Sequence, residues 1–212
     1  MHQSKSRRGS SSPERRRKTA AAAASTSAPM DMSRAEKIAK AMAMSRPSLD
    51  GLDTVLFLDV DGVLHPSQTR SHIQFCAECL QSLKAIVADC NPVIVLSSAW
   101  RTDPSGRNKL SVQLALHGIP TFKDWTKHLP GNPEEQRPKE ILDWVRTHQP
   151  STWVAIDDWP LGMNEKTMRR HFFQTDGRQG LTMQGAARVA ELLAAQRGSQ
   201  ARQKADVDQA CK

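Results

Sequence analysis

Between residues 51 and 197, short apolar runs alternate with longer segments whose apolar residues recur at helical spacing. The strongest of these runs have no polar interruption, which is typical of strands buried on both faces of a sheet. Two others are short and predict weaker strands. The predicted strands span residues 54–59, 92–96, 119–122, 153–156 and 171–174.

Helices are predicted between these strands and after the last one. They span residues 75–89, 109–117, 138–145 and 182–195. In the first of them, Leu80, Leu83, Ile86 and Val87 share one stripe. Pro138 stands where a first-turn proline is favoured, so we expect the third helix to begin there. Strands that alternate with helices indicate an α/β protein, a Rossmann-like three-layer αβα sandwich around a mostly parallel central sheet.

The net charge of +8 is concentrated outside this region. Residues 1–50 contain 11 Lys or Arg and 4 Asp or Glu, whereas residues 51–212 contain 19 and 18. The N-terminal segment is a basic, Arg/Ser/Ala-rich tail with too few large apolar residues to offset the entropy of ordering, so we predict that it is disordered. We expect a single domain at residues 51–197 and a flexible C-terminal tail at 198–212.

Three interpretations of the N-terminal tail remain open. It is a flexible solvated linker, or an organelle transit peptide, because it is rich in Arg and Ser and poor in acids. In the third interpretation, residues 15–18 (RRRK) form a nuclear-localisation or polyanion-binding patch. Residues 31–44 have a helix-forming composition and predict a short helix.

Composition also restricts the setting of the protein. No apolar run reaches the roughly 18 residues of a membrane span, and no signal-peptide core follows the basic start, so we expect an intracellular protein without a membrane partner. It would be cytoplasmic, or organellar if the tail is a transit peptide. Four cysteines are too few for a disulfide scaffold. Cys76 and Cys79 form a lone CxxC without the further ligands that zinc needs, and we expect them to pack on the first helix.

Polar residues follow three of the predicted strands directly. The first strand ends in Asp59-Val60-Asp61-Gly62, the second in Ser97-Ser98 and the fourth in Asp157-Asp158. The carboxyl ends of parallel strands meet at one edge of a sheet, where ligands bind in open α/β folds. Carboxylates gathered there repel one another unless a cation offsets their charge, and Mg²⁺ is usually held by one or two carboxylates together with waters and phosphate. The pattern predicts a magnesium site that takes a phosphorylated ligand.

The phosphate itself needs further donors. Ser97 and Lys139 are the candidates, because Lys139 lies close to the predicted start of a helix, whose free N–H groups add to the attraction for an anion. Arg101 is a third candidate, although it could instead pair with an acid. Its neighbour Trp100 could stack on a base or simply pack a loop.

These residues resemble the motifs of the haloacid dehalogenase-like (HAD) superfamily of aspartate-nucleophile phosphatases. The run VLFLDVDGVL at 55–64 looks like the first motif, VIVLS at 93–97 like the second, Lys139 like the third, and VAIDD at 154–158 like the fourth. A narrower resemblance, in LSSAWR at 96–101, LHGIP at 116–120 and GLT at 180–182, is to the small HAD group of bacterial and phage proteins and of "Swiss Army Knife" RNA-repair polypeptides.

The resemblance implies a mechanism. Asp59 would attack phosphorus and form an aspartyl-phosphate, and Asp61 would protonate the leaving oxygen and then activate water. Ser97 and Lys139 would hold the transferring phosphoryl group. The implied ligands of Mg²⁺ are the carboxylate of Asp59, the backbone carbonyl of Asp61, Asp157, and Asp158 either directly or through water.

Short inserts between the motifs predict a capless or minimally capped domain. An open site suits a bulky phosphorylated substrate, such as a protein phosphosite, a nucleic-acid end or a large metabolite. The leading hypothesis is Mg²⁺-dependent hydrolysis of a phosphoric monoester. The alternatives are a phosphatase for 3′ or 5′ ends of RNA or DNA, and a weakly active or non-catalytic binding module with the HAD fold. The oligomeric state stays open.

Overall fold

A computed structural model describes residues 52–67 and 75–210. The predicted tail at 1–50 and the short helix expected at 31–44 lie outside the described residues. A five-stranded sheet forms the centre, in the order β3-β2-β1-β4-β5, and every neighbouring pair is parallel. The strands are β1 (Thr54–Leu58), β2 (Val93–Leu96), β3 (Asp124–Trp125), β4 (Thr152–Asp157) and β5 (Phe172–Gln174).

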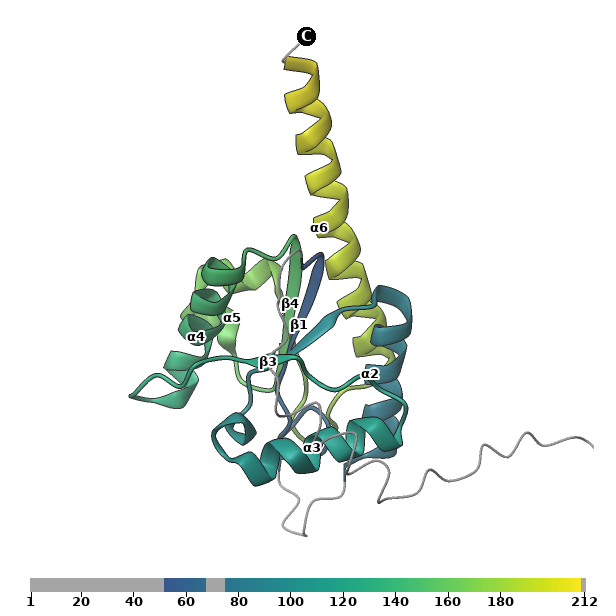
Figure 1. Cartoon of the computed structure of the whole chain (residues 1–212), viewed down its shortest axis with the longest axis vertical. Coiled ribbons are helices and arrows are strands. Elements are labelled where there is room, and N and C mark those ends of the chain that lie inside the picture. Colours follow the sequence, from purple (N-terminus) through teal and green to yellow (C-terminus); the bar gives the residue numbers. More distant parts are fainter. Residues whose placement is uncertain (1–51, 68–74, 211–212) are drawn as a thin grey trace, which may run out of the picture.

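Helices cover both faces of this sheet (Figure 1). The longer ones are α2 (Ala77–Cys90), α3 (Pro104–Leu116), α4 (Pro133–His148) and α6 (Met183–Ala210). Shorter turns are η1 (Ala99–Thr102), α5 (Leu161–Asn164) and η2 (Lys166–Arg170). The three-layer α/β architecture predicted from the sequence is confirmed. Among the described residues, no helix combines the length and apolar character needed to cross a membrane.

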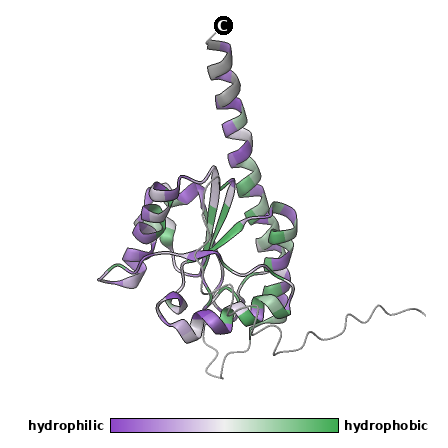
Figure 2. Cartoon of the chain, viewed as in Figure 1, coloured by the Kyte–Doolittle hydropathy of each residue, from purple (hydrophilic) through white to green (hydrophobic). Residues whose placement is uncertain are grey.

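The alternation of side chains along β1 divides the core into two parts. Leu56 and Leu58 pack into the cluster that α2, α3 and α6 cover, whereas Val55 and Phe57 pack into the cluster that α4 and α5 cover. Successive residues of a strand point to opposite faces, so a strand buried on both sides must be apolar throughout. In Figure 2 the central strands carry hydrophobic colouring, whereas the helices around them carry both hydrophobic and hydrophilic residues.

Several element boundaries differ from the prediction. Helix α4 begins at Pro133, not Pro138, because the Asn132 side chain accepts a hydrogen bond from the Glu134 N–H and caps the helix there. Helix α3 likewise begins at Pro104, earlier than predicted, because Asp103 caps its start. Strand β3 was expected at 119–122, and the pairing with β2 instead begins at Asp124.

Helix α6 also differs from the prediction. It was expected to end at Ala195 and continues to Ala210, through the segment expected to be a flexible tail. Residues 199–210 contain Gln, Ala, Arg and Lys but neither Pro nor Gly, a composition that favours helix. Figure 1 shows this second half projecting away from the sheet.

Candidate active site

The polar residues that follow β1 and β2, and those at the end of β4, meet at one edge of the sheet. The ladder continues past β1, because the Asp59 N–H donates to the Ile156 carbonyl and the Ser97 N–H donates to the Leu58 carbonyl. The register therefore brings Asp59 beside both Ser97 and Asp157. The prediction that these residues share one edge is confirmed.

Asp59, Asp157 and Asp158 form a cluster whose ligand oxygens all lie within 4.8 Å of one another. Asp59 and Asp157 are buried and Asp158 is partly exposed. Gly62 makes room for this cluster, because a Cβ at its position would lie 2.2 Å from Asp158 Oδ2. Gly62 also has φ of +73°, a conformation that other residues adopt only with strain. Both the close contact and the backbone conformation therefore require glycine at the end of the DVDG segment.

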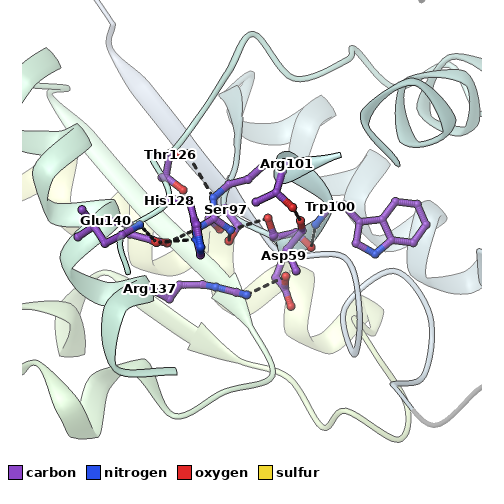
Figure 3. A network of polar contacts seen from close by, with 12 residues as sticks. Asp59, Ser97, Trp100, Arg101, Thr126, His128, Arg137 and Glu140 are labelled. Carbon is purple, nitrogen blue, oxygen red and sulfur yellow. Dashed lines mark hydrogen bonds and ion pairs between the residues drawn. The ribbon is translucent and has the colours of Figure 1, made fainter. Parts of the chain in front are cut away.

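Arg137 is the cation of this cluster. Its Nη1 lies 2.8 Å from Asp59 Oδ1 and 2.8 Å from Asp157 Oδ2, and only 3% of the residue is exposed. The guanidinium also lies over the Trp159 ring, 4.3 Å from its centroid. Figure 3 shows Arg137 reaching toward Asp59 from α4.

Lys139 does not occupy this place. It is exposed on α4, two residues beyond Arg137. The phase of the helix explains the difference, because Arg137, Ile141 and Trp144 recur at i, i+4 and i+7 on the buried face. Lys139 was chosen because α4 was expected to begin at Pro138. The position of Arg137 could have been recognised by extending the apolar stripe of Ile141 and Trp144 back by one turn.

Burial and charge crowding shift the carboxyl groups of the cluster. Burial, followed by the charge of Asp59, raises the pKa of Asp157 to about 8 and that of Asp158 to about 6. Burial also raises the pKa of Asp59, against the opposing effect of Arg137. Burial tends to lower the pKa of Arg137, but the carboxylates of Asp59 and Asp157 outweigh it and the pKa is raised. One guanidinium thus faces three carboxyl groups, which leaves the cluster short of positive charge.

The Asp61 carboxylate contacts two aromatic side chains. Trp100 Nε1 donates a hydrogen bond to Asp61 Oδ2 at 3.0 Å, and His65 Nε2 lies 3.0 Å from Oδ1. Burial alone would raise the pKa of Asp61, but His65 and Trp100 outweigh this effect and lower it. The contact with Asp61 in turn raises the pKa of His65. Neither Trp100 nor His65 was predicted as an Asp61 partner, because the contact depends on how two loops meet.

Arg101 was predicted to bind phosphate, but its guanidinium hydrogen-bonds backbone carbonyls and pairs with an acidic side chain of the protein itself. Its Nη1 donates to the Ser98 carbonyl at 2.6 Å and to the Ser97 carbonyl at 3.3 Å, and its Nε donates to the Thr126 carbonyl at 3.2 Å. Its Nη2 forms an ion pair with Glu140 of α4. Both side chains are buried. Figure 3 shows this network linking the segments after β2 and β3 to α4.

Ser97 keeps its hydroxyl free. Its Oγ is buried and has no hydrogen-bond partner among the described residues. A buried hydroxyl without a partner is costly unless a ligand completes it. The neighbouring Ser98 hydroxyl hydrogen-bonds the Asp59 carboxylate. A phosphoryl oxygen at this edge would supply the acceptor that Ser97 lacks.

The cluster fits a hard divalent cation. Three closely spaced carboxylates are the oxygen donors that Mg²⁺ prefers. Burial and then the charge of Asp59 raise the pKa of Asp157 and Asp158, and a bound cation would offset both effects. The Asp61 carboxylate is not part of this donor set, because it is turned toward Trp100 and His65.

The strand order, the aspartates after β1 and the single helix α2 in the described part of the connection to β2 define a capless HAD-like domain. The family described as "HAD domain in Swiss Army Knife RNA repair proteins" matches residues 55–186, and the chain belongs to that family. Comparisons with curated proteins and with solved structures gave no match. The family suggests a phosphatase-like or RNA-repair function.

Proposed function

We propose that this protein is a Mg²⁺-dependent phosphatase that hydrolyses a phosphoric monoester through an aspartyl-phosphate on Asp59. The observation that carries the proposal is the surroundings of Asp59. Its carboxylate is buried at the end of β1, paired with Arg137 and close to two further carboxylates. A structural aspartate needs a partner, but it does not need two further acids and a free buried hydroxyl beside it.

The first step is attack of a carboxylate oxygen of Asp59 on phosphorus. The oxygen–phosphorus bond to the enzyme forms as the bond to the leaving alcohol breaks, and the electron pair of the broken bond goes to the leaving oxygen. Asp61 gives that oxygen a proton, so the alcohol leaves neutral. Arg137 and the Ser97 hydroxyl stabilise the charge that develops on the phosphoryl oxygens.

The second step returns the enzyme to its starting state. Asp61, now ionised, takes a proton from a water molecule as that water attacks the phosphorus of the aspartyl-phosphate. The bond between phosphorus and the Asp59 oxygen breaks, inorganic phosphate forms, and the proton remains on Asp61 for the next cycle. Asp59, Asp157 and Asp158 would hold the metal ion, which supplies positive charge next to the phosphoryl oxygens.

A direct test is hydrolysis of p-nitrophenyl phosphate with Mg²⁺ by the wild type and by Asp59→Asn. We expect turnover in the wild type and loss of at least about 1000-fold in the variant, because the amide is no nucleophile. Asp89→Asn is the matched control, since Asp89 is an exposed residue of α2. Retained turnover in Asp59→Asn would reject the assignment of the nucleophile, and absence of turnover in the wild type would favour a non-catalytic binding module.

A second candidate function is removal of phosphate from a nucleic-acid end, which the description of the family favours. The partly buried Trp100 lies beside Asp61, where the leaving group must be, and aromatic faces stack on bases. Comparing a 3′-phosphorylated oligonucleotide, a phosphopeptide and a sugar phosphate tests this candidate. A preference for the oligonucleotide that declines steeply with salt would support it, and a preference for either other substrate would contradict it.

A further inference from the structure

Cys76 and Cys79 form an asymmetric pair at the start of α2. Cys76 is the residue immediately before the helix and is partly exposed, whereas Cys79 lies inside the first turn and is only 1% exposed. Cys76 lies close enough to Cys79 to raise the pKa of that thiol, and Cys76 Sγ donates a hydrogen bond to Glu78 Oε2 at 2.9 Å. The proposed phosphatase mechanism uses neither thiol.

The helix start accounts for the contact between the two side chains. Cys76 has extended backbone angles, φ −73° and ψ 125°, and its side chain makes no capping hydrogen bond to the helix. A side chain at this position is aimed over the first turn, toward the residue three positions later. That residue is Cys79. In a helical turn the Cα atoms of residues i and i+3 are about 5 Å apart, which is within the Cα separation of roughly 4.4–6.8 Å found in disulfides.

The two thiols differ in accessibility. Cys79 is enclosed, with its Sγ 3.5 Å from the Gln179 carbonyl. Gly180 lies so close that a Cβ there would come within 2.7 Å of this sulfur. Burial, followed by the neighbouring Cys76, raises the pKa of Cys79 to about 12, so this thiol keeps its proton at neutral pH. An oxidant from solution therefore meets Cys76 first, with a protonated partner in contact behind it.

We propose that Cys76 and Cys79 are an oxidative modification site that forms a reversible intramolecular disulfide when the protein meets a peroxide. The sulfur of Cys76 attacks one peroxide oxygen, the O–O bond breaks, and an alcohol or water leaves with the thiol proton. The product is the sulfenic acid of Cys76. The Cys79 sulfur then attacks the Cys76 sulfur, the S–O bond breaks, and water leaves with the Cys79 proton. The two sulfurs lose two electrons in total, and the peroxide gains them.

The pair lies next to the segment that carries Asp61. The Cys76 N–H donates to the Leu64 carbonyl at 2.9 Å, and Phe75 packs edge-on against Trp100, with ring centroids 5.6 Å apart. On the other side of the pair, Cys79 Sγ donates to the Gln179 carbonyl. Two residues later in the chain, the Leu181 N–H donates to the carbonyl of Val63, which lies two residues after Asp61. Formation of the disulfide does not require that the chain be a phosphatase, so this site can be tested separately.

The experiment treats the full-length, folded protein with hydrogen peroxide, blocks the remaining thiols with iodoacetamide and analyses tryptic peptides by mass spectrometry. Residues 71–84 form one tryptic peptide that contains both cysteines. We expect this peptide to be lighter by two hydrogen atoms and free of alkylation, and dithiothreitol should restore the alkylated form. In Cys76→Ser, which places a favoured capping residue at the helix start, the cross-linked peptide should be absent. Cys90→Ser should behave as the wild type.

Two outcomes would overturn the proposal. One is a peptide that stays reduced, or in which Cys76 is oxidised to a sulfinic acid while Cys79 remains alkylatable. The other is a cross-link that forms only after the protein is unfolded in urea, because the native contact would then have no part in it.

Discussion

At the scale of single residues, the prediction and the structure differ in which basic residue of α4 reaches the aspartates. Arg137 contacts Asp59 and Asp157 from the buried face of the helix, whereas Lys139 is exposed. Only the first can meet a phosphoryl group on Asp59. The resemblance to the HAD motifs predicts a basic residue in this segment, and the structure brings Arg137 rather than Lys139 to the acidic cluster.

The pair Arg137→Lys and Lys139→Met tests this difference. Arg137→Lys keeps a positive charge but loses the forked guanidinium, so we expect kcat to fall by at least about 10-fold. Lys139→Met should change kcat less than about twofold, because removing one exposed charge affects the site only weakly. Steady-state kinetics with p-nitrophenyl phosphate measures both. The reverse order of effects would contradict the placement of Arg137 in the site.

Trp100 supplies a second prediction at this scale. Trp100→Phe removes the indole N–H that donates to Asp61 Oδ2 and keeps most of the ring packing. The indole N–H holds Asp61 in place, and a misplaced acid slows the reaction most when the leaving oxygen is strongly basic. Because loss of this hydrogen bond also raises the pKa of Asp61, a slower reaction reports lost positioning and not lost protonation. We therefore expect kcat/KM to fall by about 10-fold for an alkyl phosphate and by less than about twofold for p-nitrophenyl phosphate. Equal losses for both substrates would show that Trp100 does not act through Asp61.

At the scale of elements, the ion pair of Arg101 and Glu140 joins α4 to the segments that follow β2 and β3. Glu140→Gln leaves a buried guanidinium without its counter-charge, so we expect the free energy of unfolding to fall by about 3 kcal/mol. Urea denaturation measures it. The matched control is Asp143→Asn on the same helix, whose ion pairs with Lys127 and Arg146 are exposed and should matter by less than about 1 kcal/mol. Equal losses in the two variants would contradict this role of Glu140.

The boundaries of the strands and helices show which of them the sequence pattern can predict. Strands β1, β2 and β4 were predicted to within one residue at each end, because each is an apolar run closed by a polar residue. The start of α4 was missed because the segment holds two helix-start signals, Asn132-Pro133 and Pro138. The cap at Asn132 determines the start, and Pro138 is accommodated near the beginning of the helix. The predicted start at Pro138 put Lys139 next to the expected helix N-terminus, which favoured its choice as a phosphate-binding residue.

The contacts within the candidate active site could likewise be predicted only in part. Asp59, Ser97 and Asp157 could be brought together from the sequence, because the register of parallel strands carries them to one edge. The contacts of Asp61 with His65 and Trp100 could not, because they depend on how the segments after β1 and β2 pack. Arg101 was ambiguous in the sequence for a related reason, since its acidic partner, Glu140, lies 39 residues away.

At the scale of the whole molecule, we expect the acidic cluster to make stability depend on pH and on metal. The pKa of Asp157 is raised to about 8 and that of Asp158 to about 6, from an ordinary value of 3.8. Without metal, the folded protein therefore binds more protons than the unfolded chain between about pH 4 and pH 8. The free energy of unfolding therefore falls as the pH rises from about 4, with the contribution of Asp158 lost by about pH 6 and that of Asp157 by about pH 8. A bound cation removes this penalty.

We expect Mg²⁺ to raise the melting temperature, and by more at about pH 8 than at about pH 6, because protons compete for the same oxygens. In Asp158→Asn the metal-free protein should be more stable and the effect of Mg²⁺ smaller, whereas Asp89→Asn should match the wild type. Thermal unfolding by circular dichroism, at both pH values and with and without Mg²⁺, gives this comparison. A shift that is independent of pH, or unchanged in Asp158→Asn, would contradict a cation site at this cluster.

The most direct measurement of the central claim is chemical trapping of the phosphorylated enzyme. The protein is mixed with substrate and Mg²⁺, the reaction is stopped during turnover, and borohydride is added, which reduces an aspartyl-phosphate to homoserine. The account predicts homoserine at residue 59, and only when substrate is present. Turnover with unmodified Asp59 throughout, or homoserine at another aspartate, would contradict it.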